Sequence, residues 1–181
     1  MPKLHRKRSL LAKIEGSYGS DPTATGSANY VEVVDLEIEP VASDEVEQET
    51  IRPYAGNYPV LLANTRVNLS FGVFMVGSGA AGTAPKYDPI LKSCGLSAAT
   101  VSSTSVTYTP STLATQSSVT FYVNYDGVRH KVTGCRGTFS ISCAVNEIPR
   151  INFEMQGIFN TPTDTALPTV TKSLQPDPVL F

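Results

Sequence analysis

Residues 66–76 read RVNLSFGVFMV, and every second residue is apolar: Val67, Leu69, Phe71, Val73 and Met75. An apolar period of two is typical of a strand in an antiparallel sheet that buries one face and exposes the other. Residues 30–40, YVEVVDLEIEP, repeat this pattern, with Val34, Leu36 and Ile38 on one face and Asp35, Glu37 and Glu39 on the other. The sequence therefore predicts a mainly antiparallel β protein.

The stretch after this strand, GSGAAGTAP at 77–85, places Gly77, Gly79 and Gly82 in the G-x-G-x-x-G spacing of dinucleotide-binding turns. Such a turn requires a helix that begins within the glycine motif, inside a βαβ unit of a parallel sheet. Here residues 83–85 separate the glycines from the next helix signal, and the preceding strand alternates as antiparallel strands do. We expect no cofactor and interpret the stretch as a loop that contacts a neighbouring chain, with glycines free to adopt positive φ.

Further strand signals follow. SVTFYVNY at 118–125 and VRHKVTG at 128–134 flank Asp126-Gly127, a dipeptide that favours a tight hairpin turn. CRGTFSISCAV at 135–145 and RINFEMQGIF at 150–159 extend the series. We expect an antiparallel β-sandwich or rolled barrel, with its sheet system built from 67–76, the hairpin and 150–159.

One short helix is predicted over 88–94, on the outer side of the sheets. Asp88 can cap it, Pro89 suits its first position, and Gly95 favours its end. LHRKRSLLAKI at 4–14 fits either a second helix or an ordered arm. These signals divide the chain into an N-terminal arm (1–29), a β-domain (30–160) and an extended Pro/Thr-rich C-terminal segment (161–181).

Charge is distributed unevenly, although the formal net charge is only −2. The basic residues Arg6, Lys7, Arg8 and Lys13 are concentrated in the N-terminal arm, whereas ten carboxylates and no Lys or Arg lie from Glu15 to Glu49. This contrast favours pairing of opposite charges between chains, or a face that repels polyanions; a solvated tail and strand face explain it equally well. The acidic candidates for contact are Asp35, Glu37, Glu39, Asp44, Glu45, Glu47 and Glu49.

Catalytic and metal-binding signals are weak. His130 lies in a strand pattern without a nucleophile motif, and no metal-ligand spacing occurs. Cys94, Cys135 and Cys143 form no C-x-x-C pair, so we interpret them as small buried residues. With no long apolar stretch and no signal-peptide pattern, we expect a cytoplasmic, non-enzymatic protein without membrane contact.

Five stretches, taken in order, resemble the tail tube (major tail) proteins of long-tailed phages, a family similar in fold to the type VI secretion tube protein. They are LLAKIEGSYGSDPTATG (10–26), IRPYAGNYPVLLANTRVNLSF (51–71), GSGAAGTAPKYDPILKSCGL (77–96), YDGVRHKVTGCRGTFSI (125–141) and IPRINFEMQGIFNTPTDTALPT (148–169). Each is weak alone, and together they cover most of the chain. The resemblance implies a β-sandwich or rolled barrel with a flanking helix, a long loop and a mobile N-terminal arm.

The resemblance further implies a virion protein, made in the host bacterial cytoplasm, that forms hexameric rings whose sheets join into one inner barrel. The rings would stack into a tube that meets the tape-measure, terminator and baseplate proteins and passes DNA without binding specific sequences. Contacts between subunits and between rings would fall on the N-terminal arm (1–29) and on loops 40–66 and 77–87, with Arg52, Tyr54 and Tyr58 as candidates. Acidic residues would suit either the lumen, where fixed cations would retain phosphates, or ring-to-ring contacts.

Three alternatives remain open at this point. Many relatives are longer and carry a second similar domain, so a trimer-forming relative that has lost its second half competes with the single-domain hexamer. A tail terminator or completion protein would form one ring without polymerising. From another class, a β-sandwich carbohydrate-binding module would stack exposed aromatics on sugars, but the chain has no Trp.

Overall fold

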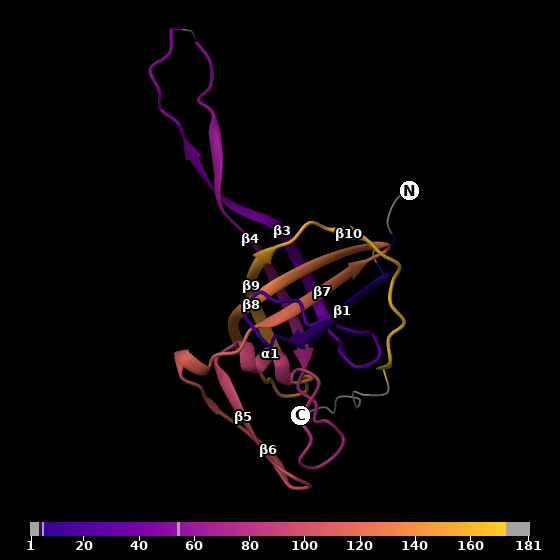
Figure 1. Cartoon of the computed structure of the whole chain (residues 1–181). Coiled ribbons are helices and arrows are strands. Elements are labelled where there is room, and N and C mark those ends of the chain that lie inside the picture. The colour runs from indigo at the N-terminus through magenta and orange to yellow at the C-terminus, as the bar shows by residue number, and fades with distance from the viewer. Residues whose placement is uncertain (1–3, 5, 54, 173–181) are drawn as a thin grey trace.

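The structure is a computed structural model that describes residues 4, 6–53 and 55–172. One eight-stranded antiparallel sheet, in the order β2-β1-β7-β8-β9-β4-β3 with β10 added to β8, forms the body (Figure 1). Its strands are β1 (Arg8–Ile14), β2 (Tyr30–Val31), β3 (Val34–Glu47), β4 (Val60–Phe74), β7 (Val119–Tyr125), β8 (Val128–Ser142), β9 (Arg150–Phe159) and β10 (Thr163–Asp164). Helix α1 (Asp88–Ser93), the hairpin β5 (Leu96–Val101) and β6 (Ser105–Pro110), and the 3-10 turn η1 (Leu113–Thr115) complete the chain.

The sheet rolls around its main apolar core without closing into a barrel, and a smaller apolar cluster contains Leu11, Ala24 and Tyr122. Phe71 and Phe121, which come from β4 and β7, meet edge to face with ring centroids 5.6 Å apart, and Phe153 of β9 packs 5.5 Å from Phe71. Aromatic pairs of this geometry stabilise a core beyond the area that they bury. The predicted fold class, mainly antiparallel β with one short flanking helix, is therefore confirmed.

Several local predictions are confirmed as well. Strand β9 has the predicted bounds, and its burial alternates strictly along residues 150–158. The turn between β7 and β8 places both Asp126 (φ 36°) and Gly127 (φ 93°) at positive φ, as the hairpin signal requires. Strand β4 begins at Val60 rather than at residue 67, so it is longer than predicted.

Helix α1 forms where it was predicted, but Asp88 does not cap it. Tyr87 occupies the N-cap without a side-chain hydrogen bond, and Asp88 lies in the first turn. The Asp88 carboxylate instead forms a 2.7 Å ion pair with Lys92 and accepts a 2.8 Å hydrogen bond from Tyr108 of β6. Asp88 thus joins the helix to the hairpin beside it.

The helix alternative for residues 4–14 is wrong. Residues 8–14 form β1, which pairs with β7 from Arg8↔Tyr125 to Ile14↔Val119. Leu10 and Ala12 are buried in the main core, and Leu11 is buried in a second cluster with Ala24 and Tyr122. With Ser9, the run of four buried residues reflects a strand covered on both faces, which explains why no alternation was visible.

Glu15, the residue after β1, joins several segments through hydrogen bonds. Its carboxylate is buried and accepts hydrogen bonds from the hydroxyls of Ser118 (2.6 Å) and Thr120 (2.5 Å). The backbone N–H groups of Gly19 (2.8 Å) and Gly134 (2.7 Å) complete the set. Burial favours the neutral acid, but these four donors outweigh it and lower the pKa of Glu15. One carboxylate thus holds together β1, β7, β8 and the loop after β1.

Candidate assembly interface

The four strands β8, β9, β4 and β3 form a continuous section of the sheet with two outer edges. Strand β7 pairs with β8 only up to Cys135, so residues 136–142 pair with β9 alone. At the other side β3 pairs with β4 alone. Within the described part of the chain, therefore, residues 136–142 and strand β3 each have one side without a strand partner.

Backbone groups on these edges can be assigned from one hydrogen bond. Met75 N–H donates to Pro149 O (2.9 Å), and in antiparallel pairs the inward and outward groups alternate from residue to residue. The registers of β4 with β9 and of β9 with β8 carry this alternation across the sheet. The backbone N–H and C=O groups of Phe139 and Ile141 therefore point away from β9, toward the open edge of β8. By the same alternation, the backbone N–H and C=O groups of Ile38 point away from β4, toward the open edge of β3. Both edges thus present hydrogen-bonding groups suited to another strand.

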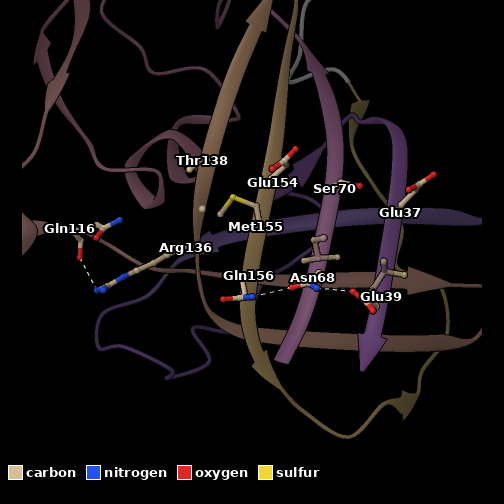
Figure 2. Close-up of a pocket in the computed structure, with 13 residues that line it drawn as sticks. Glu37, Glu39, Asn68, Ser70, Gln116, Arg136, Thr138, Glu154, Met155 and Gln156 are labelled. Carbon is tan, nitrogen blue, oxygen red and sulfur yellow. Dashed lines mark hydrogen bonds between the residues drawn. The ribbon is translucent and has the colours of Figure 1, made fainter. Parts of the chain in front are cut away.

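The solvent face of this four-stranded section carries two rows of polar side chains, which together we call the polar face (Figure 2). The strand registers align Glu37, Ser70, Glu154 and Thr138 in one row and Glu39, Asn68, Gln156 and Arg136 in the other. Asn68 Nδ2 donates to Glu39 Oε2 (2.6 Å), and Gln156 Nε2 donates to Asn68 Oδ1 (3.2 Å). Side-chain amides therefore link three strands across the face.

The polar face carries three carboxylates, and its one cation is turned aside. Arg136 points toward Gln116, whose carbonyl accepts a 3.2 Å hydrogen bond from it, and its guanidinium lies 5.0 Å from the Tyr18 ring centroid. Among the described residues, Glu37, Glu39 and Glu154 form no ion pair with a cation. The resulting surface is polar and net acidic.

The acidic residues predicted from the sequence divide between two places. Asp35, Glu37 and Glu39 lie on β3, where Asp35 forms a 3.3 Å ion pair with Arg150. Asp44, Glu45, Glu47 and Glu49 instead lie beyond the sheet body, in the projecting part of the chain described next. Sequence reasoning missed Asn68, Ser70, Glu154 and Gln156, although the alternation within INFEMQGIF already placed Glu154 and Gln156 on one face.

Residues 43–65 form a projecting ribbon, which we call the arm (Figure 1). Strands β3 and β4 pair there from Asp44↔Ala63 to Glu47↔Val60, beyond the last pair of β4 with β9 at Arg66↔Ile158. The predicted loop 40–66 is therefore largely a β-hairpin. Arg52 and Tyr58 lie in it and are exposed; Tyr54 is outside the described residues. Apolar side chains of the arm are exposed as well: Val46, Ile51, Tyr58, Val60, Leu61 and Leu62.

The glycine loop at 77–87 packs against its own chain. Gly82 has φ 68°, and a Cβ there would lie 2.4 Å from Ser103 N and 2.5 Å from Val101 O, at the tip of the β5–β6 hairpin. Gly79 also has positive φ (80°), whereas nothing lies within 4 Å of a Cβ at Gly77. The close approach at Gly82 is thus within the subunit, and contact of this loop with another chain stays a prediction.

The predicted basic residues do not form a single patch. Lys7 lies 3.7 Å from Asp126, and Arg8 donates to Leu36 O of β3 (3.1 Å). Lys13 donates to Pro22 O (2.8 Å) in the segment between β1 and β2, while Arg6 is exposed near β3. Except for Arg6, these cations are used within the subunit.

Few groups in the structure suit catalysis or metal binding. The described residues contain no cluster of His, Cys, Asp and Glu that could hold a metal ion, and none of their helices is long and apolar enough to cross a membrane. Burial raises the pKa of Cys135 and raises that of Cys94 to about 11. Cys143, predicted to be buried, is exposed because it follows the end of β8.

The fold and its surfaces thus define a β-sheet protein with two open sheet edges and an exposed apolar arm, features of a subunit that associates through its sheet. Comparison with known families agrees: a family described as "Phage tail tube protein" matches residues 6–181. The chain belongs to the phage tail tube protein family, whose members are structural components of the virion tail.

Two solved structures show similar folds. One is the anti-feeding prophage cap, described as an AFP tube terminating cap, at 10% identity and a TM-score of 0.49. The other is the sheath-tube complex of the PVC extracellular contractile injection system in its extended state, at 10% identity and a TM-score of 0.48. Each alignment covers 91% of this chain and 93% of the other. A search of curated proteins finds no match to the sequence.

Proposed function

We propose that the protein is a non-enzymatic subunit that closes into hexameric rings, and that the rings stack into the tail tube through which DNA leaves the virion. Membership of the tail tube family supports the structural role. The observation that carries the ring is the pair of open edges, the outer sides of β3 and of residues 136–142, at opposite ends of one four-stranded section.

These two edges are complementary in direction. Strands β8, β9, β4 and β3 are each antiparallel to the next, so β3 runs opposite to β8. If one subunit is related to the next by rotation about the tube axis, β3 of the first lies antiparallel to residues 136–142 of the second. A head-to-tail contact of this kind repeats and closes into a ring. It also removes the open edges, which otherwise invite uncontrolled pairing.

Ring closure can be tested at Ile141. Its N–H points outward and its residue is 54% exposed, so Ile141→Pro removes an edge donor without removing a bond between β8 and β9. We expect Ile141→Pro to stay monomeric in light scattering while the wild type forms rings and tubes under the electron microscope. The control, Ile141→Thr, also loses the apolar side chain but keeps the N–H and should still form rings.

Two outcomes would contradict this proposal. A wild type that remains monomeric at high concentration excludes the ring, and rings formed equally by Ile141→Pro exclude pairing at this edge. If the wild type yields isolated rings and no tubes, the terminator alternative replaces the tube.

In such a ring we place the polar face toward the lumen. Three carboxylates and a set of uncharged amides and hydroxyls would let DNA slide past, because fixed cations bind phosphates by releasing counterions. The variant Glu37→Lys/Glu39→Lys/Glu154→Lys should make assembled tubes retain DNA in a salt-dependent manner. Glu147→Lys, a charge reversal at an exposed loop position, serves as the control. If tubes of Glu147→Lys retained DNA and tubes of the triple variant did not, the lumen would lie on another face.

The remaining partners follow from the tube itself. Assembly would take place in the cytoplasm of the host bacterium, the tape-measure protein would occupy the lumen before DNA, and terminator and baseplate proteins would meet the two ends. Pull-down of tubes with each of these tail proteins tests the assignment.

A further inference from the structure

Strand β3 offers only a short regular edge to a neighbouring strand. Its register with β4 shifts on either side of residues 37–39. Irregularities of this kind bend an edge strand and limit the pairing that it allows. Within the regular stretch, Ile38 is the residue whose backbone groups point to the open edge.

The backbone groups on both sides of Ile38 are less suited to a neighbour. Before it, Leu36 O already accepts a 3.1 Å hydrogen bond from Arg8 of β1. After it, the same alternation directs Pro40 outward, and proline has no N–H to donate. Along residues 36–40, a neighbouring strand can therefore exchange a full pair of hydrogen bonds with β3 only at Ile38.

On the partner edge, Ile141 is the last outward-pointing residue before β8 ends. In an antiparallel contact it can oppose Leu36, Ile38 or Pro40 of the next copy. Opposite Leu36 it would compete for a carbonyl that is already used, and opposite Pro40 it would find no donor. Opposite Ile38 both hydrogen bonds form, and a polar group left unpaired on burial is costly. Hydrogen bonding therefore favours the pair of Ile38 with Ile141.

The tilt of the strands provides a second, independent criterion. Within a subunit the registers align one residue from each of the four strands in a row: Ile38, Leu69, Met155 and Gly137. If this row continued straight into the next copy, Ile38 would oppose Gly137 and the strands would run parallel to the ring axis. Each residue of displacement, or stagger, adds about 3.3 Å along the strands, while four strands span about 19 Å across them.

A stagger of four residues therefore tilts the strands by about 35° from the ring axis. Staggers of two and six residues give about 19° and 46°. Strands in closed barrels are tilted by about 35–45°, so four residues fit this range. A stagger of six would also place Ile38 opposite Cys143, beyond the end of β8. The stagger of four again places Ile38 opposite Ile141.

We propose that successive subunits join with a stagger of four residues, with Ile38 of one copy opposite Ile141 of the next, and that Arg8 helps to exclude other registers. The inference rests on the proposed ring and specifies its contact. The Arg8 side chain holds Leu36 O inside its own subunit, which removes the register with a stagger of two. Ile38 and Ile141 both lie on the face opposite to the polar face, so Ile141, 54% exposed in one subunit, is covered by the next.

Engineered disulfides between copies measure the register. Beside Ile38, the proposed register places Glu39 opposite Ser140 of the next copy. This pair is not hydrogen-bonded, so its Cα atoms lie about 4.5 Å apart, within the range of a disulfide. In a Cys143→Ser background, Glu39→Cys/Ser140→Cys should give covalent multimers when assembled rings are oxidised and run on a non-reducing gel. The altered side chains are all exposed, so rings should still form.

Two matched variants report the other registers. With Cys143→Ser, the variants Glu39→Cys/Thr138→Cys and Glu39→Cys/Ser142→Cys would be bridged at staggers of two and six residues. In the proposed register these pairs are displaced along the strands, with Cα atoms about 8 Å apart, beyond the reach of a disulfide. Both should stay monomeric on the gel. Strands β3 and β8 lie on the two sides of the section (Figure 2), so none of these disulfides can form within one copy.

The role of Arg8 is tested in the same three backgrounds. Arg8→Ala releases the carbonyl of β3, so part of the disulfide product should move from the Ser140 variant to the Thr138 variant. The control, Lys7→Ala, removes a neighbouring cation that pairs with the turn after β7 and should leave the Ser140 variant as the only one that cross-links. If Arg8→Ala gave the same pattern as Lys7→Ala, Arg8 would have no part in setting the register.

The outcomes separate this inference from the ring itself. Cross-linking in the Thr138 or Ser142 variant but not in the Ser140 variant overturns the stagger of four residues and leaves the ring intact. Rings that form in all three variants without any disulfide product overturn it as well. Failure of the wild type to form rings overturns the proposed function and, with it, the register.

Discussion

Replacement of Gly82 by alanine should destabilise the subunit because its Cα faces the backbone of the β5–β6 hairpin. A Cβ at this position would lie 2.4 Å from Ser103 N, 2.5 Å from Val101 O and 2.9 Å from Thr104 N. All three are backbone atoms, so no side-chain rotation can relieve the contact. The residue also has φ 68°, a conformation that L side chains rarely adopt.

The magnitude follows from these two terms. A left-handed conformation costs a non-glycine residue about 1–2 kcal/mol, and overpacking that shifts the backbone costs about 1–3 kcal/mol. The hairpin is exposed and can move, so we expect Gly82→Ala to lower the free energy of unfolding by about 2–4 kcal/mol. Gly77→Ala meets nothing within 4 Å and should change it by less than about 0.5 kcal/mol.

Urea unfolding of both variants, followed by circular dichroism at a protein concentration below that of assembly, measures the difference. Hydrogen exchange at Ser103 and Thr104 should accelerate in Gly82→Ala alone. Equal unfolding midpoints for Gly82→Ala and Gly77→Ala would refute the steric argument. If Gly82→Ala kept full stability and yet lost tubes, the loop would contribute through contact with another chain instead.

Three further predictions concern single groups. Glu15→Ala should cost about 2–4 kcal/mol, because it leaves buried donors unpaired. The pKa of Glu15 is lowered in the folded state. The stability that its carboxylate contributes is therefore complete above the unfolded pKa and is lost as pH falls through the folded pKa. Below about pH 4, the melting temperature should drop more for the wild type than for Glu15→Gln. Tyr122→Phe should cost about 1 kcal/mol by losing the 2.6 Å hydrogen bond to Asp21. Burial and the Asp21 carboxylate raise the pKa of Tyr122 to about 12, and burial and Asp88 raise that of Tyr108 as well, so ultraviolet titration of Tyr122→Phe should show one late tyrosine fewer than the wild type. Cys143 should react at once with a thiol reagent, and Cys135 only after unfolding; equal rates would contradict the burial of Cys135.

The sequence predicted those elements whose signal is local. Alternation identified β9 and the body of β3 and β4, and Asp126-Gly127 identified the turn between β7 and β8, because each pattern is fixed by one strand or one turn. Strand β1 gave no such signal because it is covered on both faces, and Tyr122 of β7, which packs with Leu11, is more than a hundred residues away in the chain. The capping role of Asp88 failed for a similar reason, since Lys92 and Tyr108 compete for its carboxylate.

The candidate interface was predictable only in part. The sequence alone predicted that Asp35, Glu37 and Glu39 share one face of a strand. The alignment of Glu37 with Glu154, however, depends on the register of three strands. The family resemblance implies a loop at 40–66, and the consecutive apolar residues Val60, Leu61 and Leu62 lack the alternation that would indicate a strand. In the structure they have no core to face, and a ribbon exposed on both sides imposes no period of two.

The position of β9 between β8 and β4 has a consequence for synthesis on the ribosome. Strands β3 and β4 are complete by residue 74, and β8 by residue 142, but the four-stranded section does not exist until residues 150–159 insert between them. At about 5–20 residues per second, the ribosome needs several seconds to pass from the end of β4 to the end of β9. During that interval a nascent chain lacks the sheet section whose two edges we propose to join. The proposed polymerisation would thereby be delayed on polysomes, where neighbouring nascent chains are crowded together, until residue 159 has emerged.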